Sequence, residues 1–575
     1  MELENAQLLD YAVSRFQAGK YDEALEAFML VYSRGYEQEW IIENIYSCYM
    51  WGNDDLFRKT YEQQTVNAEI CYEDCLLDFV PYRDGEYYIF DKGIGIFRGK
   101  FSMDALEEAK LHVGIEKIEF GAVVFEMDWN WNDRLNILTA AKDRKIYVIG
   151  HDMQRLVSFY KIPELASYMK NIMGFSSLDE FQVYFHTNTS VYLPYVVLGN
   201  KEQKQELMNV IEREHQYRLT PEGRNTENVL LTIGIPTHDR GNLLLRRLEN
   251  LRKMPYDAEI EIAISKNGTM LYQEEYREVD KLKDARISYY DHKKNLEGVV
   301  NWHYTIQMSH GKYVMLVSDE DDVCLDAIAH YLNLLMKFPD MVLCLAKGSY
   351  YYADVVERIY RKSGYAAFQE VFLRTTYISG LIFRRKDFLQ NDFLQLQKYV
   401  KNEFYHYYAH MWWTALICMD GDYMEEPLQL ITQVDNVQLE EYQQYAALGK
   451  RDVNNYYAIA ERLPIYATYE ERMKQFEGQI EFLHIIEEKH PEVIESGLIK
   501  AVDKQGLFFC IALQSRYKIS EFLLFVDQLA NVSVDAVGQF QLSEQQQLNV
   551  LNVIKDNIEY MIQLHTNLTQ QERDD

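Results

Sequence analysis

An apolar segment near the middle of the chain runs directly into a cluster of acidic residues. Tyr313–Val317 has the composition of a buried strand, and Ser318–Asp322 follows it with three aspartates and one glutamate. Asp319 and Asp321 are two residues apart, so in an extended segment their side chains point the same way. Carboxylate oxygens suit Mg²⁺ or Mn²⁺, which take their other ligands from water and phosphate. The segment therefore predicts a divalent metal beside a nucleotide diphosphate, and a solvated acidic loop is the alternative.

The length and charge of the chain limit what it can bind. At 575 residues the chain is too long for one hydrophobic core, and length alone suggests about three or four domains. The formal net charge of −30 would repel nucleic acid or an anionic bilayer over the whole surface, so neither is expected as the main partner. A nucleotide sugar is also anionic, and its site would need a local metal or basic cluster.

Tyrosine is unusually frequent, with 45 residues in the chain. A tyrosine ring offers a flat apolar face with a polar tip, which suits a sugar-binding cleft. Packing between helical layers explains the same composition, so the count alone does not decide between the two.

The cysteines and the first residues predict the compartment. The seven cysteines are scattered, and only Cys71 and Cys75 are close, without a second pair or histidine at zinc spacing. They indicate free thiols in a reducing compartment. The first residues lack the basic leader and apolar core of a signal peptide, and no stretch approaches the roughly 20 apolar residues of a membrane span. A cytoplasmic protein is expected, with peripheral membrane association left open.

The pattern along the chain predicts four regions. These are a helical, tetratricopeptide-like region at 1–75, a small α/β domain at 76–226, a larger α/β domain at 227–435 and a helical region at 436–575. Gly19 separates two amphipathic segments, as in a tetratricopeptide repeat. Ser543 and Gln546 form a capping box before an apolar stripe. The helical regions are candidates for binding a partner or for self-association.

The small α/β domain carries strand signals but no cofactor motif. The predicted strands are a hairpin at Tyr87–Phe90 and Ile94–Phe97, and a strand-helix-strand unit at Ala122–Phe125 and Ile146–Ile149 with a helix from about Asn132. The nearby glycines miss the dinucleotide-binding spacing, because Arg98 stands where the third glycine belongs. The charged stretch Glu212–Asn228 is predicted to be a linker.

Polar residues follow each predicted strand of the larger α/β domain. Val229–Ile235 is followed by a polar turn, Ile260–Ile264 by an Asn-Gly turn, and Tyr313–Val317 by the acidic segment, with a helix opening near Asn295–Asn301. In a parallel sheet these polar endings lie at the same carboxyl edge, where open α/β folds bind ligands. We therefore expect one ligand site at this edge.

These residues, in this order, resemble family-2 glycosyltransferases of the GT-A fold. The pieces are Ile235-Pro-Thr-x-x-Arg240, the turn Asn267-Gly-Thr269, Asn295-x-x-Gly298, and Gly311-Lys-Tyr-Val314 followed by the Asp-x-Asp motif at Asp319–Asp322. The resemblance covers residues of about 229 to 430, and Ile378–Arg385 resembles the segment beside the family's acceptor site. It implies a GT-A type nucleotide-diphospho-sugar transferase domain at 227–435.

The resemblance also implies roles for individual residues. Asp321 would bind the metal, Asp319 would bind the metal or the donor ribose, and Asp322 is a further candidate ligand. The donor nucleotide sugar would be lined by residues from the other strand ends: Pro236, Thr237, Arg240, Asn267, Asn295 and Gly298. A metal on the diphosphate stabilises the charge that builds on the leaving group.

Lys266 departs from the family pattern, which usually has an aspartate that reads uracil at this place. A lysine cannot accept the N3–H proton of the base. The neighbouring Asn267 amide can accept from N3–H and donate to O4, so Asn267 or the backbone is expected to read the base. A different nucleotide, or a site that no longer works, stays open as an alternative.

Inverting transfer also needs a base that deprotonates the acceptor hydroxyl. The family usually supplies a carboxylate from an acidic pair on a helix before the last sheet element. Here that helix carries His406 and His410, four residues apart and expected on one face. His410 is the first choice because histidine is a competent base near neutral pH, and Glu403 is the second. Packing on an aromatic helix is the alternative for His410.

Together these inferences predict a metal-dependent inverting glycosyltransferase using Mn²⁺ or Mg²⁺. It would move a hexose-type sugar from a nucleoside diphosphate donor, with UDP favoured, to an acceptor hydroxyl on a glycan, lipid or protein. The family resemblance places this reaction in bacterial surface glycan synthesis. Two other classes remain: a binding module that holds nucleotide sugar without turnover, which Lys266 and the missing acidic pair favour, and a scaffold organised by the helices.

Overall fold

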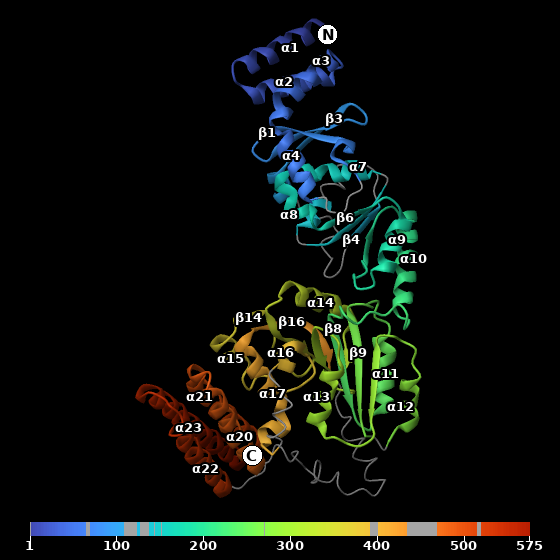
Figure 1. Cartoon of the computed structure of the whole chain (residues 1–575). Coiled ribbons are helices and arrows are strands. Elements are labelled where there is room, and N and C mark those ends of the chain that lie inside the picture. The colour runs from blue at the N-terminus through green and yellow to red at the C-terminus, as the bar shows by residue number, and fades with distance from the viewer. Residues whose placement is uncertain are drawn as a thin grey trace. The chain divides into compact units, whose positions relative to one another are not determined.

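The chain divides into two compact units, Met1–Tyr217 and Arg218–Asp575, which are considered separately here. The structure, a computed structural model (Figure 1), describes residues 2–64, 70–108, 123–126, 137–142, 144–150, 152–268, 271–390, 401–433, 469–513 and 519–574.

The first unit begins with helices that pack as predicted. They are α1 (Glu2–Gln17), α2 (Tyr21–Ser33), α3 (Gln38–Ile45) and α4 (Trp51–Gln64). Gly19 lies in the turn between α1 and α2 with a φ of +73°, a backbone conformation that glycine adopts without strain. The inner face of α2, including Leu25 and Phe28, is buried. The helical hairpin is therefore confirmed, and its likeness to a tetratricopeptide repeat stays a prediction.

Two small sheets follow the helices. β1 (Leu77–Arg83), β2 (Glu86–Asp91) and β3 (Ile96–Ser102) form an antiparallel sheet; β4 (Val123–Glu126), β5 (Ile146–Ile149), β6 (Ile172–Phe175) and β7 (Val196–Leu198) form a parallel one in the order β6-β5-β4-β7. The β2–β3 pairing confirms the predicted hairpin, and β4 and β5 pair in parallel as the strand-helix-strand prediction requires. The helix predicted from Asn132 begins outside the described residues, and residues 137–141 are helical.

The predicted linker Glu212–Asn228 is helical in its first part. Helix α10 spans Lys201–Arg218, with Leu207 and Val210 buried on one side. A Gln216–Glu212 side-chain hydrogen bond of 2.7 Å joins residues one turn apart on its exposed face. The charged composition therefore marks the solvated face of a helix, because residues four apart support one another along it.

The second unit is built on a nine-stranded mixed sheet. Its strands are β8 (Leu231–Thr237), β9 (Ile260–Asn267), β10 (Ile287–His292), β11 (Tyr313–Leu316), β12 (Asp322–Val323), β13 (Met341–Gly348), β14 (Ile359–Arg361), β15 (Leu381–Arg384) and β16 (Asp422–Thr432). The order is β10-β9-β8-β11-β15-β13-β16-β12, and β14 pairs with β16. The strands β10, β9, β8 and β11 run parallel, so their carboxyl ends meet at one edge as predicted.

Helices cover the two faces of the parallel strands. They are α11 (Gly241–Leu251), α12 (Gln273–Asp280) and α13 (Gly298–Met308), followed along the chain by α14 (Ile328–Lys337), α15 (Tyr365–Val371), α16 (Arg385–Gln390) and α17 (Glu403–Asp420). Figure 1 shows α11 and α12 on one side of β8 and β9, and α13 on the other. The whole of β9 is buried, and its buried charged residues Glu261 and Lys266 have partners in Thr232 and Asp291.

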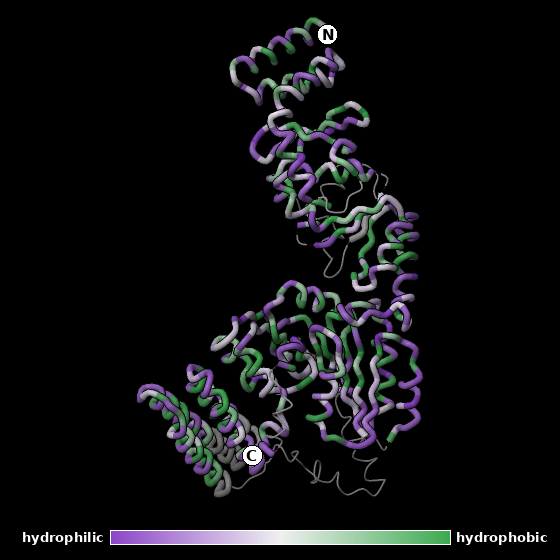
Figure 2. The backbone as a smooth tube through the Cα atoms, in the orientation of Figure 1, coloured by the Kyte–Doolittle hydropathy of each residue, from purple (hydrophilic) through white to green (hydrophobic). Residues whose placement is uncertain are grey.

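Four helices form the C-terminal part of the second unit: α20 (Tyr469–Glu487), α21 (Ile494–Leu513), α22 (Ile519–Val537) and α23 (Glu544–Asp574). Figure 2 shows hydrophilic and hydrophobic residues alternating along these helices. Their apolar faces, including Phe482, share one core with Phe404 and Trp412 of α17. The predicted capping box is confirmed, because Ser543 N–H donates to Gln546 Oε1 at 3.0 Å and Gln546 N–H donates to Ser543 Oγ at 3.3 Å.

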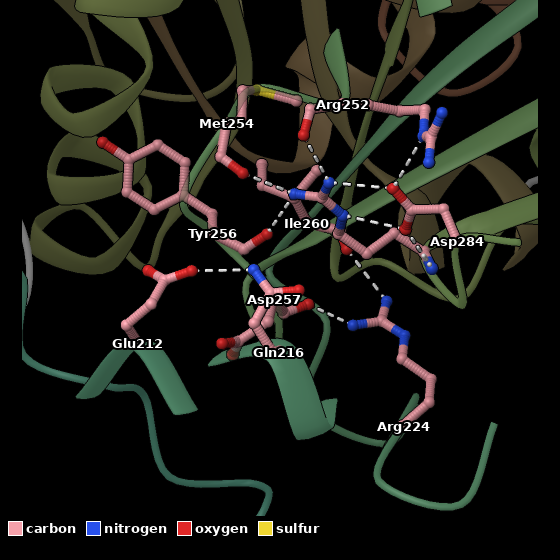
Figure 3. A network of polar contacts seen from close by, with 10 residues as sticks. Glu212, Gln216, Arg224, Arg252, Met254, Tyr256, Asp257, Ile260 and Asp284 are labelled. Carbon is pink, nitrogen blue, oxygen red and sulfur yellow. Dashed lines mark hydrogen bonds and ion pairs between the residues drawn. The ribbon is translucent and has the colours of Figure 1, made fainter. Parts of the chain in front are cut away.

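A buried arginine fixes the connection between α11 and β9 at the opposite edge of the sheet (Figure 3). The guanidinium of Arg286 donates to the carbonyl oxygens of Arg252, Met254 and Tyr256 at 2.7–3.0 Å. The carboxylate of Asp284 accepts two further bonds from it, at 2.9 and 3.1 Å. Since a buried cation is costly unless fully hydrogen-bonded, this network holds the turn rigidly against β10.

No described helix is both long enough and apolar enough to cross a membrane.

Candidate active site

The acidic segment is a turn, so the expectation of an extended segment with Asp319 and Asp321 facing the same way is wrong. Asp321 N–H donates to the carbonyl of Ser318 at 3.0 Å, which closes the turn. The chain becomes extended again only at Asp322, the first residue of β12. The turn gives Asp319, Asp321 and Asp322 different partners. Asp319 and Asp321 are nevertheless both deeply buried, with 3% and 2% of their surface exposed.

Asp319 is held by residues from the end of β8. Thr237 Oγ1 donates to its Oδ2 at 2.6 Å, and Arg240 Nη1 lies 3.1 Å from its Oδ1. The same guanidinium lies 2.9 Å from Glu320 Oε2. Tyr276 of α12 completes a chain, because its hydroxyl bonds Thr237 Oγ1 at 2.7 Å and accepts the backbone N–H of Arg240 at 3.1 Å. The predicted donor residues Thr237 and Arg240 are therefore brought together with Asp319.

Asp321 and Asp322 face different elements. The hydroxyl of Tyr377, just before β15, donates to Asp321 Oδ2 at 2.8 Å. Asp322 Oδ1 instead pairs with Arg247 of α11 at 2.6 Å, and Arg247 also donates to the carbonyl of Glu320. A small pocket lies against α11, and Arg247, Asp321 and Asp322 are among its lining residues. Arg247 thus ties the turn to α11 and engages the carboxylate of Asp322.

Whether Asp319, Asp321 and Asp322 could hold a divalent cation depends on the number and burial of their carboxylate oxygens. Among the described residues, no group of three or more His, Cys, Asp or Glu side chains is arranged to hold a metal. Mg²⁺ and Mn²⁺ beside a nucleotide need fewer protein ligands, because one or two carboxylates suffice when phosphate and water supply the rest. Asp319 and Asp321 offer two buried hard-oxygen groups at one strand end, and this pair fits such a cation. Asp322 is the poorer candidate because its side chain is 37% exposed and pairs with Arg247 of α11, whereas Asp319 and Asp321 are buried.

Asn267 is engaged with the segment before α13, and its role in reading the base stays a prediction. Its amide Nδ2 donates to Asn295 Oδ1 at 3.0 Å and to the carbonyl of Glu297 at 3.4 Å, and its Oδ1 accepts from Leu296 N–H at 2.6 Å. Both amide hydrogens are used, so the expected donation to a base O4 would require breaking a bond. One lone pair of the oxygen remains for an N3–H group.

Lys266 is not directed to an open base pocket. Its Nζ lies 3.2 Å from Asp291 Oδ2 of β10 and 5.0 Å from the ring centroid of Tyr276. The side chain is buried, so the ion pair with Asp291 offsets the cost of desolvating the ammonium. Lys266 stands where the family usually has an aspartate, and here its charge is balanced by Asp291 on the neighbouring strand β10.

Two glycines shape the donor side in different ways. Gly268, at the end of β9 with a φ of +32°, would place a Cβ 2.2 Å from the backbone of Lys294 and Asn295, so only glycine allows this close approach. Gly298 opens α13, is exposed, and a Cβ there would meet nothing within 4 Å. Asn295, also exposed, accepts Glu297 N–H at 2.8 Å. Pro236 is half-buried in β8.

His410 is buried in an aromatic cluster, with 4% of its surface exposed. Its ring lies 5.7 Å from Trp302 and 6.1 Å from Tyr408, centroid to centroid. Neither ring nitrogen makes a geometric hydrogen bond to a described residue. Burial lowers the pKa of His410 to about 4, and the nearby main chain of Thr375 and Thr376 opposes the shift. His410 is therefore neutral at pH 7 and a weaker base than an exposed histidine.

A kink in α17 separates His406 from His410. Tyr408 has non-helical angles, φ −134° and ψ 42°, so the expectation that both histidines share one helical face is wrong. His406 is exposed and His410 is buried. Glu403 lies in the first turn of α17, before the kink, and is half-buried.

Sequence reasoning missed three residues that hold the acidic turn: Tyr276, Tyr377 and Arg247. Tyr276 is the buried aromatic of an otherwise highly charged helix, a signal that a polar contact is being made. Tyr377 directly precedes the segment Ile378–Arg385 that was singled out. Arg247 is a buried arginine on the inner face of α11, and only the tertiary structure shows its partner.

The family comparison agrees with this arrangement. Residues 232–393 match the family model described as glycosyl transferase family 2. The match spans β8 to α16 and so includes the strand ends and the acidic turn. The GT-A type α/β fold expected from the sequence, with helical regions at both ends, is thereby confirmed. No curated protein matches the chain.

Solved structures resemble the chain only distantly. The crystal structure of S. aureus TarS residues 1–349 in complex with UDP-GlcNAc has 10% sequence identity and a TM-score of 0.41, over 60% of this chain and 92% of that one. The mannosyltransferase PcManGT from Pyrobaculum calidifontis, in complex with GDP-Man and Mn²⁺, has 10% identity and a TM-score of 0.30, over 66% of this chain and 98% of that one. Likenesses this weak carry no argument about the site of this chain.

Proposed function

We propose that the protein is a metal-dependent inverting glycosyltransferase that moves a hexose-type sugar from a nucleoside diphosphate, with UDP favoured, to an acceptor hydroxyl. The observation that carries the proposal is the contact of Asp319 with Thr237 and Arg240 at one sheet edge, with the buried Asp321 two residues further along the same turn. Buried acids at the carboxyl ends of parallel strands occupy the place where open α/β folds bind nucleotides. The family match over the same residues supports this assignment.

On the donor side, Asp321 and Asp319 would hold Mn²⁺ or Mg²⁺. When bound, such a cation supplies positive charge to the leaving diphosphate. Arg240 adds a guanidinium beside the same turn, which suits phosphate oxygens. The exposed opening of α13, with Asn295 and Gly298, would lie along the donor, because backbone N–H groups at a helix N-terminus favour anions. The base would be read by the remaining lone pair of Asn267 or by the backbone.

On the acceptor side, the transfer forms a bond from the acceptor oxygen to the anomeric carbon and breaks the bond to the diphosphate. The acceptor hydroxyl loses its proton to a base. His410 remains our first candidate because burial keeps its imidazole neutral at pH 7, so that a ring nitrogen can accept a proton. Glu403 remains the second. We place the reaction in a glycan pathway of the bacterial cytoplasm, with partners bound by the terminal helical regions.

A donor screen tests the proposal. Nucleoside diphosphate release is measured with Mn²⁺ for UDP-, GDP- and dTDP-sugars in the absence of an acceptor. Slow hydrolysis of a UDP-sugar that stops on chelation of the metal is the expected result. Calorimetry with UDP, GDP and dTDP gives the base preference, and failure to bind UDP would remove uridine recognition.

Two matched variants in the acidic turn separate the roles of its carboxylates. Asp321→Asn is expected to reduce turnover by about 100-fold or more, because the neutral amide removes a metal ligand. Asp322→Asn is the control, since this carboxylate is paired with Arg247, and a much smaller loss is expected. Equal losses of turnover in the two variants would show that Asp322 is also a metal ligand.

A non-catalytic nucleotide-sugar-binding module is the second candidate. The low pKa of His410, about 4, and the absence of the family's acidic pair favour it. Donor binding without hydrolysis by any of the tested sugars would support the module and contradict the enzyme.

A further inference from the structure

Three tyrosines stand together next to the acidic turn. The rings of Tyr351 and Tyr377 are stacked, with centroids 4.1 Å apart and planes 9° from parallel. Tyr350 meets Tyr351 edge-on, at 5.1 Å and 89°. We call Tyr350, Tyr351 and Tyr377 the tyrosine wall. Such ring pairs are favourable beyond the apolar area that they bury, so the wall has a defined shape.

Tyr352 and Gln433 form hydrogen bonds with the main chain of the wall. Tyr352 has a φ of +62°, a left-handed conformation that costs a non-glycine residue free energy. Its hydroxyl accepts Tyr377 N–H at 2.7 Å and donates to the Tyr377 carbonyl. The side-chain oxygen of Gln433 accepts Tyr350 N–H at 2.8 Å. The main chain on both sides of the wall is therefore fixed before any ligand arrives.

The wall nevertheless exposes aromatic surface to solvent. Tyr350 is 67% exposed and Tyr351 is 37% exposed, whereas Tyr352 beside them is buried. Packing explains the contact of Tyr351 with Tyr377, but it does not explain why so much of Tyr350 is left exposed. Water-exposed aromatic faces on a rigid support are a feature of ligand sites that have few polar groups.

The position of the wall relates it to the transfer reaction. Tyr377 donates its hydroxyl hydrogen to Asp321 Oδ2, the proposed cation ligand. Tyr351 stacks on the ring of Tyr377, so Tyr377 alone separates it from Asp321 in this chain of contacts. An acceptor hydroxyl must come to the same place, between the donor diphosphate and the base.

We propose that the tyrosine wall binds a pyranose ring of the acceptor, so that the acceptor is a carbohydrate. This inference rests on the proposed function and names the acceptor class of the same site. One face of a pyranose presents a row of C–H groups and its rim carries hydroxyls. A tyrosine matches both, with an apolar face and a polar tip. Glu320 and Asp321 beside the wall supply acceptors for the rim hydroxyls.

Saturation-transfer NMR tests the wall directly. The full chain, with the diamagnetic cation Mg²⁺ and UDP, is mixed with the methyl glycosides of glucose, galactose, mannose and N-acetylglucosamine. At least one is expected to bind through the C–H groups of one face. Tyr351→Ala and Tyr350→Ala are each expected to weaken that binding about three- to tenfold. Tyr351→Phe keeps the ring and is expected to bind within about twofold of the parent.

Tyr560→Ala is the matched control, because Tyr560 is a 57% exposed tyrosine on α23; its pyranoside binding should equal that of the parent. Circular dichroism confirms that each variant is folded. If no methyl glycoside binds, or if Tyr350→Ala and Tyr351→Ala bind as well as the parent, the inference is overturned.

The parent protein separates this inference from the proposed function. If the parent hydrolyses a donor but binds no pyranoside, the inference about the tyrosine wall is overturned and the proposed transferase function is not. Pyranoside binding that depends on Tyr351, without hydrolysis of any donor, would support the wall and contradict the enzyme.

Discussion

The hydroxyl of Thr237 donates a hydrogen bond of 2.6 Å to Oδ2 of Asp319. Thr237 ends β8 and Asp319 follows the neighbouring strand β11, so the bond joins two strand ends that are 82 residues apart in the chain. Since Thr237 donates to Asp319, the hydroxyl of Tyr276 must donate to Thr237 Oγ1 and accept from the backbone N–H of Arg240. The chain of hydrogen bonds therefore ends on Oδ2 of Asp319, which accepts.

This relationship predicts the effect of Thr237→Val. The variant keeps the shape of the side chain but removes one bond to a charged group, so we expect a loss of about 1.5–3 kcal/mol in the free energy of unfolding. We also expect weaker binding of the UDP-sugar, because Asp319 is no longer positioned. Urea unfolding and calorimetry measure the two effects.

Thr232→Val is the control for that variant. Thr232 lies at the other end of β8, where its hydroxyl donates to the buried carboxylate of Glu261 at 2.7 Å. Its loss should destabilise the fold to a similar degree without changing donor affinity. Equal effects of both variants on donor binding would show that Asp319 has no particular role.

A second prediction concerns Gly298 at the start of α13. A Cβ at this position meets no atom within 4 Å, so Gly298→Ala should leave stability unchanged or raise it by up to about 1 kcal/mol through helix propensity. If the donor approaches this backbone closely, the same variant weakens donor binding. Gly52→Ala in α4, which is equally free of steric contacts, should leave donor binding unchanged. If Gly298→Ala binds the donor with full affinity, the donor does not approach the start of α13.

A third prediction follows from the pKa of His410. Burial lowers it from 6.5 to about 4 in the folded state, so the folded chain binds a proton less readily than the unfolded chain. The stability linked to this group is present above pH 6.5 and is lost as the pH falls towards 4, by up to about 3 kcal/mol. His410→Phe should lose less stability than the parent over this range, as measured by urea unfolding at several pH values. Parallel pH curves for the two proteins would show that the pKa of His410 is the same in the folded and the unfolded chain.

A fourth prediction tests His410 as the base. His410→Ala should reduce turnover by about 100-fold or more if it accepts the acceptor proton, and donor affinity should stay within about twofold. His406→Ala is the control, because this histidine is exposed on the other side of the kink. The pH profile of the parent should lack an inflection near 6.5. Normal turnover in His410→Ala with a large loss in Glu403→Gln would transfer the role to Glu403.

Much of the transferase domain could be predicted from the sequence. The apolar strands, the polar residues after each of them and the opening of α13 are local patterns, and local patterns decide where strands and helices begin and end. The capping box at Ser543 and Gln546 is local in the same sense and is present as expected. The linker prediction failed at Glu212, because a charged helix face and a charged coil have the same composition.

The amino-acid sequence by itself determined the order of strands and helices and the gathering of Asp319 and Asp321 with Thr237 and Arg240, because parallel strands bring their carboxyl ends to one edge. Only the tertiary structure decided which way each carboxylate turns. That choice depends on partners that are distant in sequence, Thr237 for Asp319, Tyr377 for Asp321 and Arg247 for Asp322. Burial makes such pairings decisive, since a charge removed from water must be matched by a nearby donor or cation.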